Sequence, residues 1–321
     1  MTARFVSPLA AALERFLEFK RRRGYLYNRP ELTLRRFDRF VAACAKRDAS
    51  WKLHEVILAW LASRPGRQAV SVSYEMAVIR QFWIYVRRVH PARCRVEVRW
   101  PKLPTKTSFV PHVLTKSDVH TLLRAASKLK RPHFRRVLYR ALLLMLYCTG
   151  LRIGEALRLR IGDVDLRRDV IFVAEFKGRA RWVPFRRSLS REFERYLRAR
   201  RAFSGSDPRP DDPFFVINGG RRLLPNAAGQ VLRRMFRMTG LKPSIDRGGP
   251  RAYDLRHTFA VHRLTRWYRA RVDLHARLPW LSAYMGHLDL LGTETYLTAT
   301  PELLALVARR FHHRFVGDRR Q

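Results

Sequence analysis

Apolar residues at helical spacing run through most of this chain of 321 residues, and they restrict it to a mainly helical fold. Between residues 8 and 90 such a stripe occurs four times, and Pro91 ends the last one. The stripes are formed by Leu9, Leu13 and Phe16; by Phe37, Phe40, Val41 and Cys44; by Leu53, Val56, Ile57, Trp60 and Leu61; and by Ile79, Phe82, Trp83 and Val86. The pattern therefore predicts a helical N-terminal domain over residues 1–91.

The second half of the chain adds a short strand-like region to further helices. Thr115-Lys116-Ser117-Asp118 is typical of a capped helix start, and an apolar helix over about 132–148 is expected to end at Gly150. Residues 165–173 and 181–185 have strand-like composition. Further helices are expected at about 190–202, 226–239, 254–270, 277–285 and 301–314. The sequence thus predicts a mainly α fold with a small antiparallel β-sheet, of the α+β class.

The charge of the chain is strongly unbalanced. It has 66 Lys and Arg residues against 26 Asp and Glu residues, which gives a formal net charge of +40. Such an excess favours a polyanionic partner, and nucleic acid is the commonest one. Basic residues gather between the apolar stripes at 20–23, 35–36 and 87–88. Each cluster alone is typical of a solvated helix face, but together they predict that the N-terminal domain clamps DNA.

Residues 92–112 differ from the regions on either side. Pro101, Pro104 and Pro111 disfavour a helix there. Five basic side chains accompany them, namely Arg93, Arg95, Arg99, Lys102 and Lys106. We therefore expect a basic, proline-containing linker that lies along DNA and leads into a second domain over residues 113–321.

Cysteine usage and the apolar runs indicate the cellular setting. The three cysteines show no paired spacing, which argues against a disulfide scaffold and a zinc cluster. Glu14 and Arg15 interrupt the short apolar run at 9–13, so no signal peptide is expected. The longest apolar run, 141–147, is far shorter than the ~20 residues of a membrane span. We expect a cytoplasmic, nucleoid-associated protein with no membrane partner.

Several kinds of DNA chemistry lack their residues here. Metal-dependent cleavage uses convergent carboxylates, but the few acidic residues fall mostly in caps, turns and helix faces. Gly219-Gly220 is followed by Arg221-Arg222, which does not match a phosphate-binding loop. His257 and His262 are five residues apart and do not share a helix face as zinc ligands would. What remains is phosphoryl transfer without metal or cofactor, in which fixed cations hold the phosphate and a side chain attacks it.

Four features of the second half occur in a specific order. Two arginine-containing boxes stand at Thr149-Gly150-Leu151-Arg152-Ile153-Gly154-Glu155-Ala156-Leu157 and at Asp254-Leu255-Arg256-His257-Thr258-Phe259-Ala260. Lys177 lies at the turn between the expected strands, and Gly286-His287 precedes Tyr296 by nine residues. Taken jointly, these features resemble the tyrosine recombinases, the phage integrase family. The resemblance covers roughly residues 113–314, and more loosely the N-terminal helices resemble the family's SAM-like core-binding domain.

The resemblance implies a role for each matching residue. Arg152 and Arg256 would hold the scissile phosphate and stabilise its transition state. Lys177 would protonate the leaving 5′-oxygen, and His287 would hydrogen-bond a phosphate oxygen and help with proton transfer. Tyr296 would attack and form a 3′-phosphotyrosyl bond, which a 5′-hydroxyl later reverses without ATP or metal. Glu155, one helical turn from Arg152, would orient its guanidinium.

One position departs from the family pattern. The second box usually begins with a histidine three residues before the arginine, where this chain has Tyr253. The spacing still places Tyr253 and Arg256 on one helix face. Two interpretations of Tyr253 stay open: it hydrogen-bonds the phosphate, or it only fills the position. His257 is not expected to replace the missing histidine, because it lies about 100° further round the helix. Tyr284, the alternative nucleophile, is expected to pack within a helical apolar stripe.

The sequence therefore predicts a site-specific recombinase, integrase or transposase that breaks and rejoins double-stranded DNA. The resemblance implies a homotetramer on two DNA sites, linked by exchange of the C-terminal helix, with companion recombinases as further partners. That helix could instead pack on its own core. Two other functions stay open: a catalytically impaired DNA-binding relative, motivated by Tyr253, and a type IB topoisomerase-like enzyme that nicks and closes one duplex as a monomer.

Overall fold

The computed structural model describes residues 5–48, 50–63, 69–91, 97–100, 111–174, 180–243, 248–287, 289, 291–294 and 296. It divides into two compact units, Met1–Phe109 and Val110–Gln321. Each unit has its own buried core and is described by itself. The helix expected at 301–314 and most of the linker expected at 92–112 lie outside the described residues.

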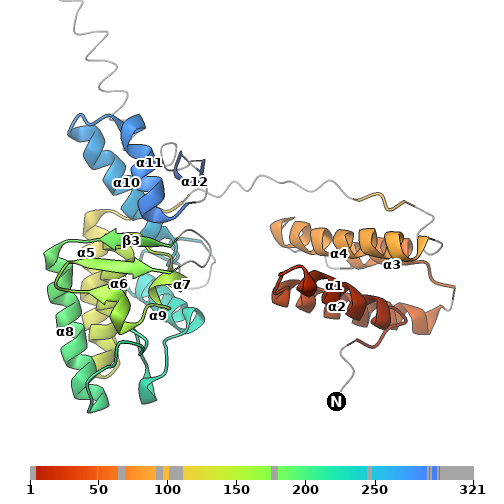
Figure 1. Ribbon diagram of the computed structural model, residues 1–321, viewed down its shortest axis with the longest axis horizontal. Helices are drawn as coiled ribbons and strands as arrows, with labels where there is room; N and C mark the ends of the chain where they lie inside the picture. The colour runs from red at the N-terminus through yellow and green to blue at the C-terminus, as the bar shows by residue number, and fades with distance from the viewer. Residues whose placement is uncertain are drawn as a thin grey trace, which may run out of the picture. The chain divides into compact units, whose positions relative to one another are not determined.

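Unit 1 is a bundle of helices, as the apolar spacing predicts. Its described helices are α1 (Ala10–Arg22), α2 (Asn28–Arg47), α3 (Leu53–Ala62) and α4 (Ala69–Val89) (Figure 1). α4 contacts each of the other three, and α2 also contacts α1 and α3. The apolar stripes face inward, where the buried rings of Phe16 and Phe82 meet edge to face, as do those of Phe37 and Trp60.

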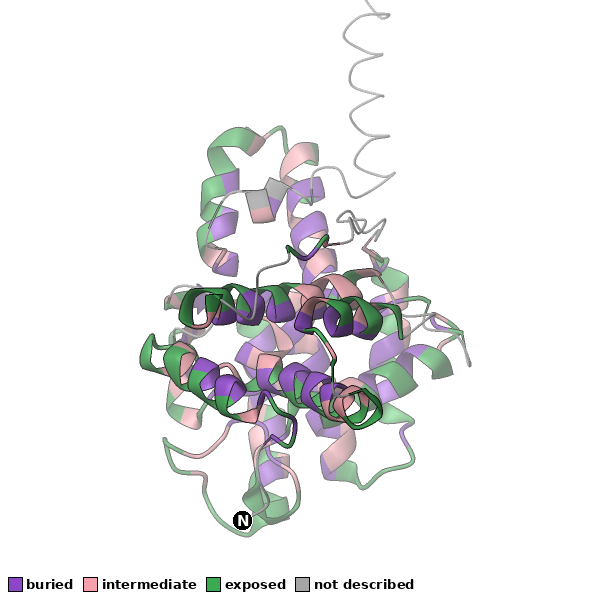
Figure 2. Ribbon diagram, turned by 90° about the vertical axis from the view of Figure 1, so that its right-hand side faces the viewer, coloured by how far each residue is buried: buried purple, intermediate pink, exposed green. Residues whose placement is uncertain are grey.

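The outward faces of unit 1 carry the basic clusters. Lys20 and Arg21 are half-buried, whereas Arg22, Arg23, Arg35, Arg36, Arg87 and Arg88 are exposed. Buried and exposed residues alternate along each of these helices (Figure 2). The bundle therefore separates an apolar interior from a positively charged surface, as expected of amphipathic helices.

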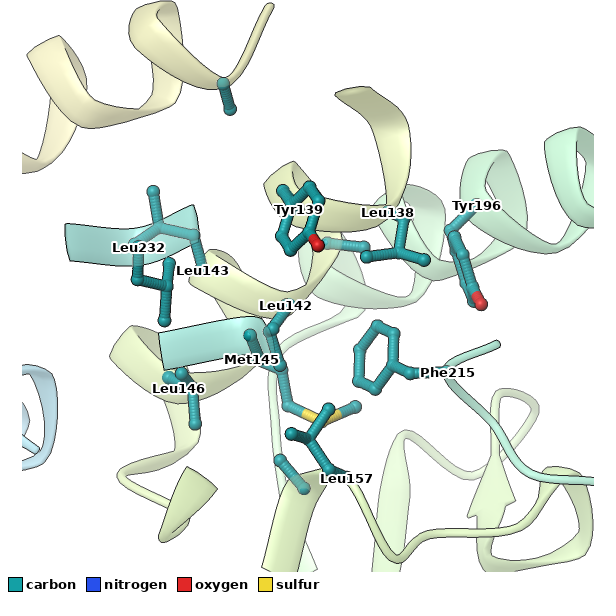
Figure 3. Close-up of a cluster of buried hydrophobic side chains, with 14 of the residues drawn as sticks. Leu138, Tyr139, Leu142, Leu143, Met145, Leu146, Leu157, Tyr196, Phe215 and Leu232 are labelled. Carbon is teal, nitrogen blue, oxygen red and sulfur yellow. The ribbon is translucent and has the colours of Figure 1, made fainter. Parts of the chain in front are cut away.

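Unit 2 combines helices with a small sheet, which confirms the predicted fold class. Its described elements are α5 (Lys116–Ser127), α6 (His133–Thr149), α7 (Ile153–Ala156), η2 (Ile161–Asp163), β1 (Val164–Asp165), β2 (Val170–Val173), β3 (Arg181–Pro184), α8 (Arg187–Ser204), η3 (Asn218–Gly220), α9 (Pro225–Met238), α10 (Asp254–Arg269), α11 (Leu274–Met285) and α12 (Leu291–Glu294). The apolar helix α6 is central, since it contacts α5, α7, α8 and α10. Leu138, Leu142 and Met145 of α6 lie in one cluster with Tyr196 of α8 and Phe215 (Figure 3).

The sheet has the order β1-β2-β3 with antiparallel pairing throughout. Ile171 is paired with Val183, and both are buried, while Phe172 and Trp182 meet on the opposite face. The single strand expected over 165–173 was wrong, because the chain turns back between β1 and β2. Asp169 closes this turn with a positive φ of 56°, a conformation that Asp tolerates better than most residues.

Two helix ends in unit 2, the start of α5 and the end of α6, have the form that the sequence predicts. α5 begins at the expected capping box, in which Thr115 and Asp118 bond each other's backbone N–H groups. α6 ends at Gly150, which adopts φ 65°, and a Cβ there would collide with the ring of Phe259 on α10. Gly150 thus lets the first box approach α10 closely. None of the described helices is long and apolar enough to cross a bilayer.

Candidate active site

Arg152 and Glu155 form the part of the site that the first box contributes. Arg152 caps α7, and it donates to Glu155 through its backbone N–H (2.9 Å) and through Nη1 (2.9 Å). Glu155 also accepts from Nη2 of Arg181 at 3.0 Å. Burial alone raises the pKa of the Glu155 carboxyl, but the bonds from Arg181 and Arg152 outweigh burial and lower it. The expected contact between Glu155 and Arg152 is present.

Arg181, at the start of β3, is a member of the site that sequence analysis missed. Its side chain is 8% exposed, and its Nε donates to the Tyr284 carbonyl at 2.8 Å. Its guanidinium occupies the space where a Cβ on Gly286 would stand. The sequence did contain a signal that Arg181 faces inward. Side chains two residues apart lie on the same face of a strand, so Arg181 shares the face of the buried Val183, opposite Trp182.

Arg256 is the centre of the part that the second box contributes. It is 1% exposed, and its Nη1 donates to the Gly150 carbonyl at 2.7 Å. Its Nη2 lies 2.8 Å from both the Met285 carbonyl and His287 Nε2. Through these contacts Arg256 joins the end of α6 to the turn after α11. Arg152 reaches the same turn, since its Nη1 and Nη2 lie 3.3 and 3.4 Å from the Gly286 carbonyl.

His287 has both ring nitrogens engaged. Because a guanidinium can only donate, His287 Nε2 accepts from Arg256, which leaves the hydrogen of the neutral ring on Nδ1. Nδ1 then donates to Thr293 Oγ1 at 2.6 Å. Burial, followed by the charges of Arg256, Arg152 and Arg181, lowers the pKa of His287 to about 4. The imidazole is therefore neutral at physiological pH.

Tyr296 is buried beside these groups, with 2% of the residue exposed. Its ring stacks on His287 at 6.0 Å between centroids and meets His257 edge-on at 5.2 Å. Burial raises the pKa of the Tyr296 hydroxyl, while Arg256 and Arg152 act in the opposite direction. The phenol is thus protonated at rest, next to two cations that favour the phenolate once it forms.

Tyr253 and His257 stand at the first turn of α10. Tyr253 is 42% exposed, and its ring meets the ring of His257 edge-on at 4.9 Å. Sequence analysis set His257 aside because of its angle round the helix. The structure instead brings its ring into contact with both Tyr253 and Tyr296. Tyr253 and His257 are four residues apart, which makes them neighbours on one helix face, whereas the angle of about 100° separates His257 from Arg256.

Two further residues complete the comparison with the sequence. Lys177 lies outside the described residues. Tyr284 packs as expected, with its ring stacked on Phe259 at 5.5 Å and its hydroxyl donating to the Pro184 carbonyl at 3.0 Å. Within the described ranges, no group of three or more His, Cys, Asp or Glu side chains is placed to hold a metal ion.

Comparison with known proteins identifies the family of this chain. The model of the phage integrase family matches residues 112–302, more than half of the chain. A Sinorhizobium fredii protein named as an integrase/recombinase, y4rB, is 31% identical over 319 residues, which cover 97% of this chain and 99% of that protein. The tyrosine recombinase XerC of Alcanivorax borkumensis is 27% identical over 253 residues, or 78% of this chain and 76% of XerC.

A solved structure supports the fold. The Tn1549 transposon integrase in complex with transposon right-end DNA aligns with a TM-score of 0.62 at 18% identity, covering 95% of this chain and 99% of that one. The fold and the relatives define a class of DNA recombination enzymes. The chain belongs to the phage integrase family, and it is a tyrosine recombinase.

Proposed function

We propose that this protein breaks and rejoins double-stranded DNA at specific sites through a 3′-phosphotyrosyl intermediate on Tyr296. The observation that carries the proposal is the position of Tyr296, buried against His287 and within the field of Arg256 and Arg152. Two fixed cations beside a tyrosine suit an attack on a phosphodiester.

Each residue then has a chemical role. Arg152 and Arg256 bind the non-bridging oxygens, for which the guanidinium offers two parallel donors. His287 hydrogen-bonds a phosphate oxygen through Nε2, which requires that Arg256 release this nitrogen and that it be protonated, and Lys177 protonates the leaving 5′-oxygen. Tyr296 is 2% exposed, so its hydroxyl has to become accessible to the phosphate when DNA binds. Tyr253, exposed at the edge of the site, donates to the phosphate.

The rest of the chain supplies DNA binding and assembly. The net charge of +40 and the exposed arginines of unit 1 support a clamp in which that unit and unit 2 hold one duplex. The Tn1549 integrase is bound to transposon-end DNA in its solved structure, which supports the same substrate class here. We further propose a homotetramer on two sites at the nucleoid, with exchange of the C-terminal segment between protomers and with companion recombinases.

A nicked suicide substrate tests the function directly. With such a substrate the short fragment that carries the new 5′-hydroxyl diffuses away, so the covalent protein–DNA adduct accumulates and survives denaturation. We expect an adduct with the wild type and none with Tyr296→Phe. Tyr284→Phe is the matched control and should retain the adduct, because its hydroxyl bonds the Pro184 carbonyl outside the site. Tight DNA binding by the wild type without any adduct would instead identify a DNA-binding relative that has lost catalysis.

A further inference from the structure

The two imidazoles that flank Tyr296 differ in their hydrogen bonds. His287 uses both nitrogens, on Arg256 and on Thr293. His257 Nδ1 is buried, yet no hydrogen-bond partner for it occurs among the described residues. A buried polar atom without a partner costs about 1–3 kcal/mol, and such atoms often have a functional reason. His257 is therefore the flanking imidazole whose lone pair is available.

The surroundings of His257 keep its ring neutral. Burial lowers the pKa of His257, and the charges of Arg251 and Arg256 act in the same direction, whereas Asp254 opposes them. Among the described aromatic side chains, the phenol rings of Tyr253 and Tyr296 meet the His257 ring. A neutral imidazole with its hydrogen on Nε2 can accept a proton at Nδ1.

The phenol of Tyr296 must lose a proton when it attacks. Burial holds that proton on the resting phenol by raising its pKa. His287 is poorly suited to take the proton, because its Nε2 lone pair already accepts from Arg256. The position three residues before Arg256, where the family usually has an imidazole, is a phenol in Tyr253.

We propose that His257 is the proton acceptor for Tyr296 in this chain. As the bond between Tyr296 Oη and phosphorus forms, the phenolic proton moves to His257 Nδ1 and the bond from phosphorus to the 5′-oxygen breaks, with a proton supplied to that oxygen by Lys177. In the rejoining step His257 returns the proton to the departing phenolate. This inference rests on the proposed function and assigns one residue of the same site.

Substrates with sulfur at the 5′ bridging position separate the two proton transfers. A thiolate leaves without protonation, so such a substrate removes the need for a leaving-group acid but not for a base on the tyrosine. Adduct formation by His257→Gln and His257→Asn should be slower by about 100-fold or more on both the oxygen and the sulfur substrate. Lys177→Ala should recover on sulfur. Recovery of the His257 variants on sulfur would overturn the proposal, as would wild-type rates on both substrates.

A pH profile distinguishes proton transfer from mere packing. On the sulfur substrate the wild-type single-turnover rate should rise as His257 loses its proton and then level off. His257→Asn should lose this plateau and rise across the whole range, because only water and hydroxide then accept the proton. A profile of unchanged shape in His257→Asn would show that the ring only packs.

A control on the same helix makes the result specific. His262 also meets a tyrosine ring edge-on, in its case that of Tyr147 at 5.9 Å. His262→Gln, compared at saturating DNA, should cleave at the wild-type rate, and an equal loss there would overturn the assignment. If the wild type forms no adduct, the proposed function fails. A wild type that forms the adduct while His257 variants match it refutes this inference alone.

Discussion

Two glutamates, one in each unit, are buried and bind two arginines each, yet their surroundings differ. In unit 1, Glu31 accepts from Arg21 Nη2 at 2.6 Å and from Arg35 Nη2 at 2.8 Å. The glutamate side chain is 8% exposed, but the arginine side chains are 36% and 45% exposed. Water therefore solvates both cations whether or not the carboxylate is present.

The arginines bound to Glu155 are less accessible to water than those bound to Glu31. Its own side chain is 3% exposed, that of Arg181 is 8% exposed and that of Arg152 is 23% exposed. Both arginines also donate to carbonyls of the turn that leads to His287. The same three-residue arrangement therefore links α1 to α2 in unit 1 and, in unit 2, connects α7 and β3 to the end of α11. Solvent access, rather than the number of ion pairs, decides what each arrangement contributes.

The largest predicted difference comes from removing each carboxylate charge. Glu155→Gln leaves Arg181 buried without a counterion and should destabilise unit 2 by about 3 kcal/mol or more. Glu31→Gln leaves two solvated arginines and should cost about 1 kcal/mol or less. Amide hydrogen exchange, read separately over α7 with β3 and over α1 with α2, measures both. Equal losses would mean that solvent access does not distinguish the two sites.

A steric change at Gly286 tests the Glu155 site through Arg181. Gly286→Ala places a methyl group within 2.5 Å of Arg181 Nη1, in a residue with φ 67°. Gly205→Ala, at the end of α8, has φ 70° and no atom within 4 Å. Both variants lose about 1 kcal/mol to the left-handed conformation, and overpacking adds roughly 1–3 kcal/mol at Gly286 alone.

Thermal unfolding and adduct formation are the measurements for this pair. Gly286→Ala should also slow adduct formation, because displacing Arg181 disturbs Glu155 and the turn before His287. Gly205→Ala should react at the wild-type rate. Similar unfolding losses in the two variants would show that Arg181 moves aside freely.

The features that the sequence singled out for the site have local signals, and the structure brings Arg152, Arg256, His287 and Tyr296 together. The arginine boxes, the histidine–tyrosine spacing and the i, i+3 contact between Arg152 and Glu155 need only neighbouring residues. The helical stripes of unit 1 are local in the same sense, and they became its core.

Contacts between distant segments were not predictable in the same way. Arg181 meets Glu155 from another element, and His257 meets Tyr296 only after the chain has folded back. In the sequence Arg181 is one of 66 basic residues, and its neighbours in the chain do not show that it contacts Glu155. The turn that separates β1 from β2 was missed because residues 166–169 contain neither Gly nor Pro.

The pH dependence of stability should sharpen the comparison further. The pKa of Glu155 is lowered in the folded protein, so its contribution is complete above the ordinary glutamate pKa and is lost as the pH falls through the folded value. Unfolding free energies of wild type and Glu155→Gln should therefore converge as the solution is acidified below that range. A constant difference between the two proteins at all pH values would contradict the burial argument.

The smallest effect is expected from the arginine partners in unit 1. Arg35→Gln removes the two hydrogen bonds from Arg35 to Glu31, but Arg21 still pairs with the carboxylate, so stability should fall by less than about 1 kcal/mol. Arg181→Gln, the counterpart in unit 2, should abolish most adduct formation because Glu155 then holds Arg152 alone. Single-turnover cleavage at saturating DNA separates the two, since weaker binding no longer limits the rate. If Arg35→Gln slows cleavage as much as Arg181→Gln, the ion pairs of unit 1 are coupled to the chemistry, and burial alone does not explain the difference.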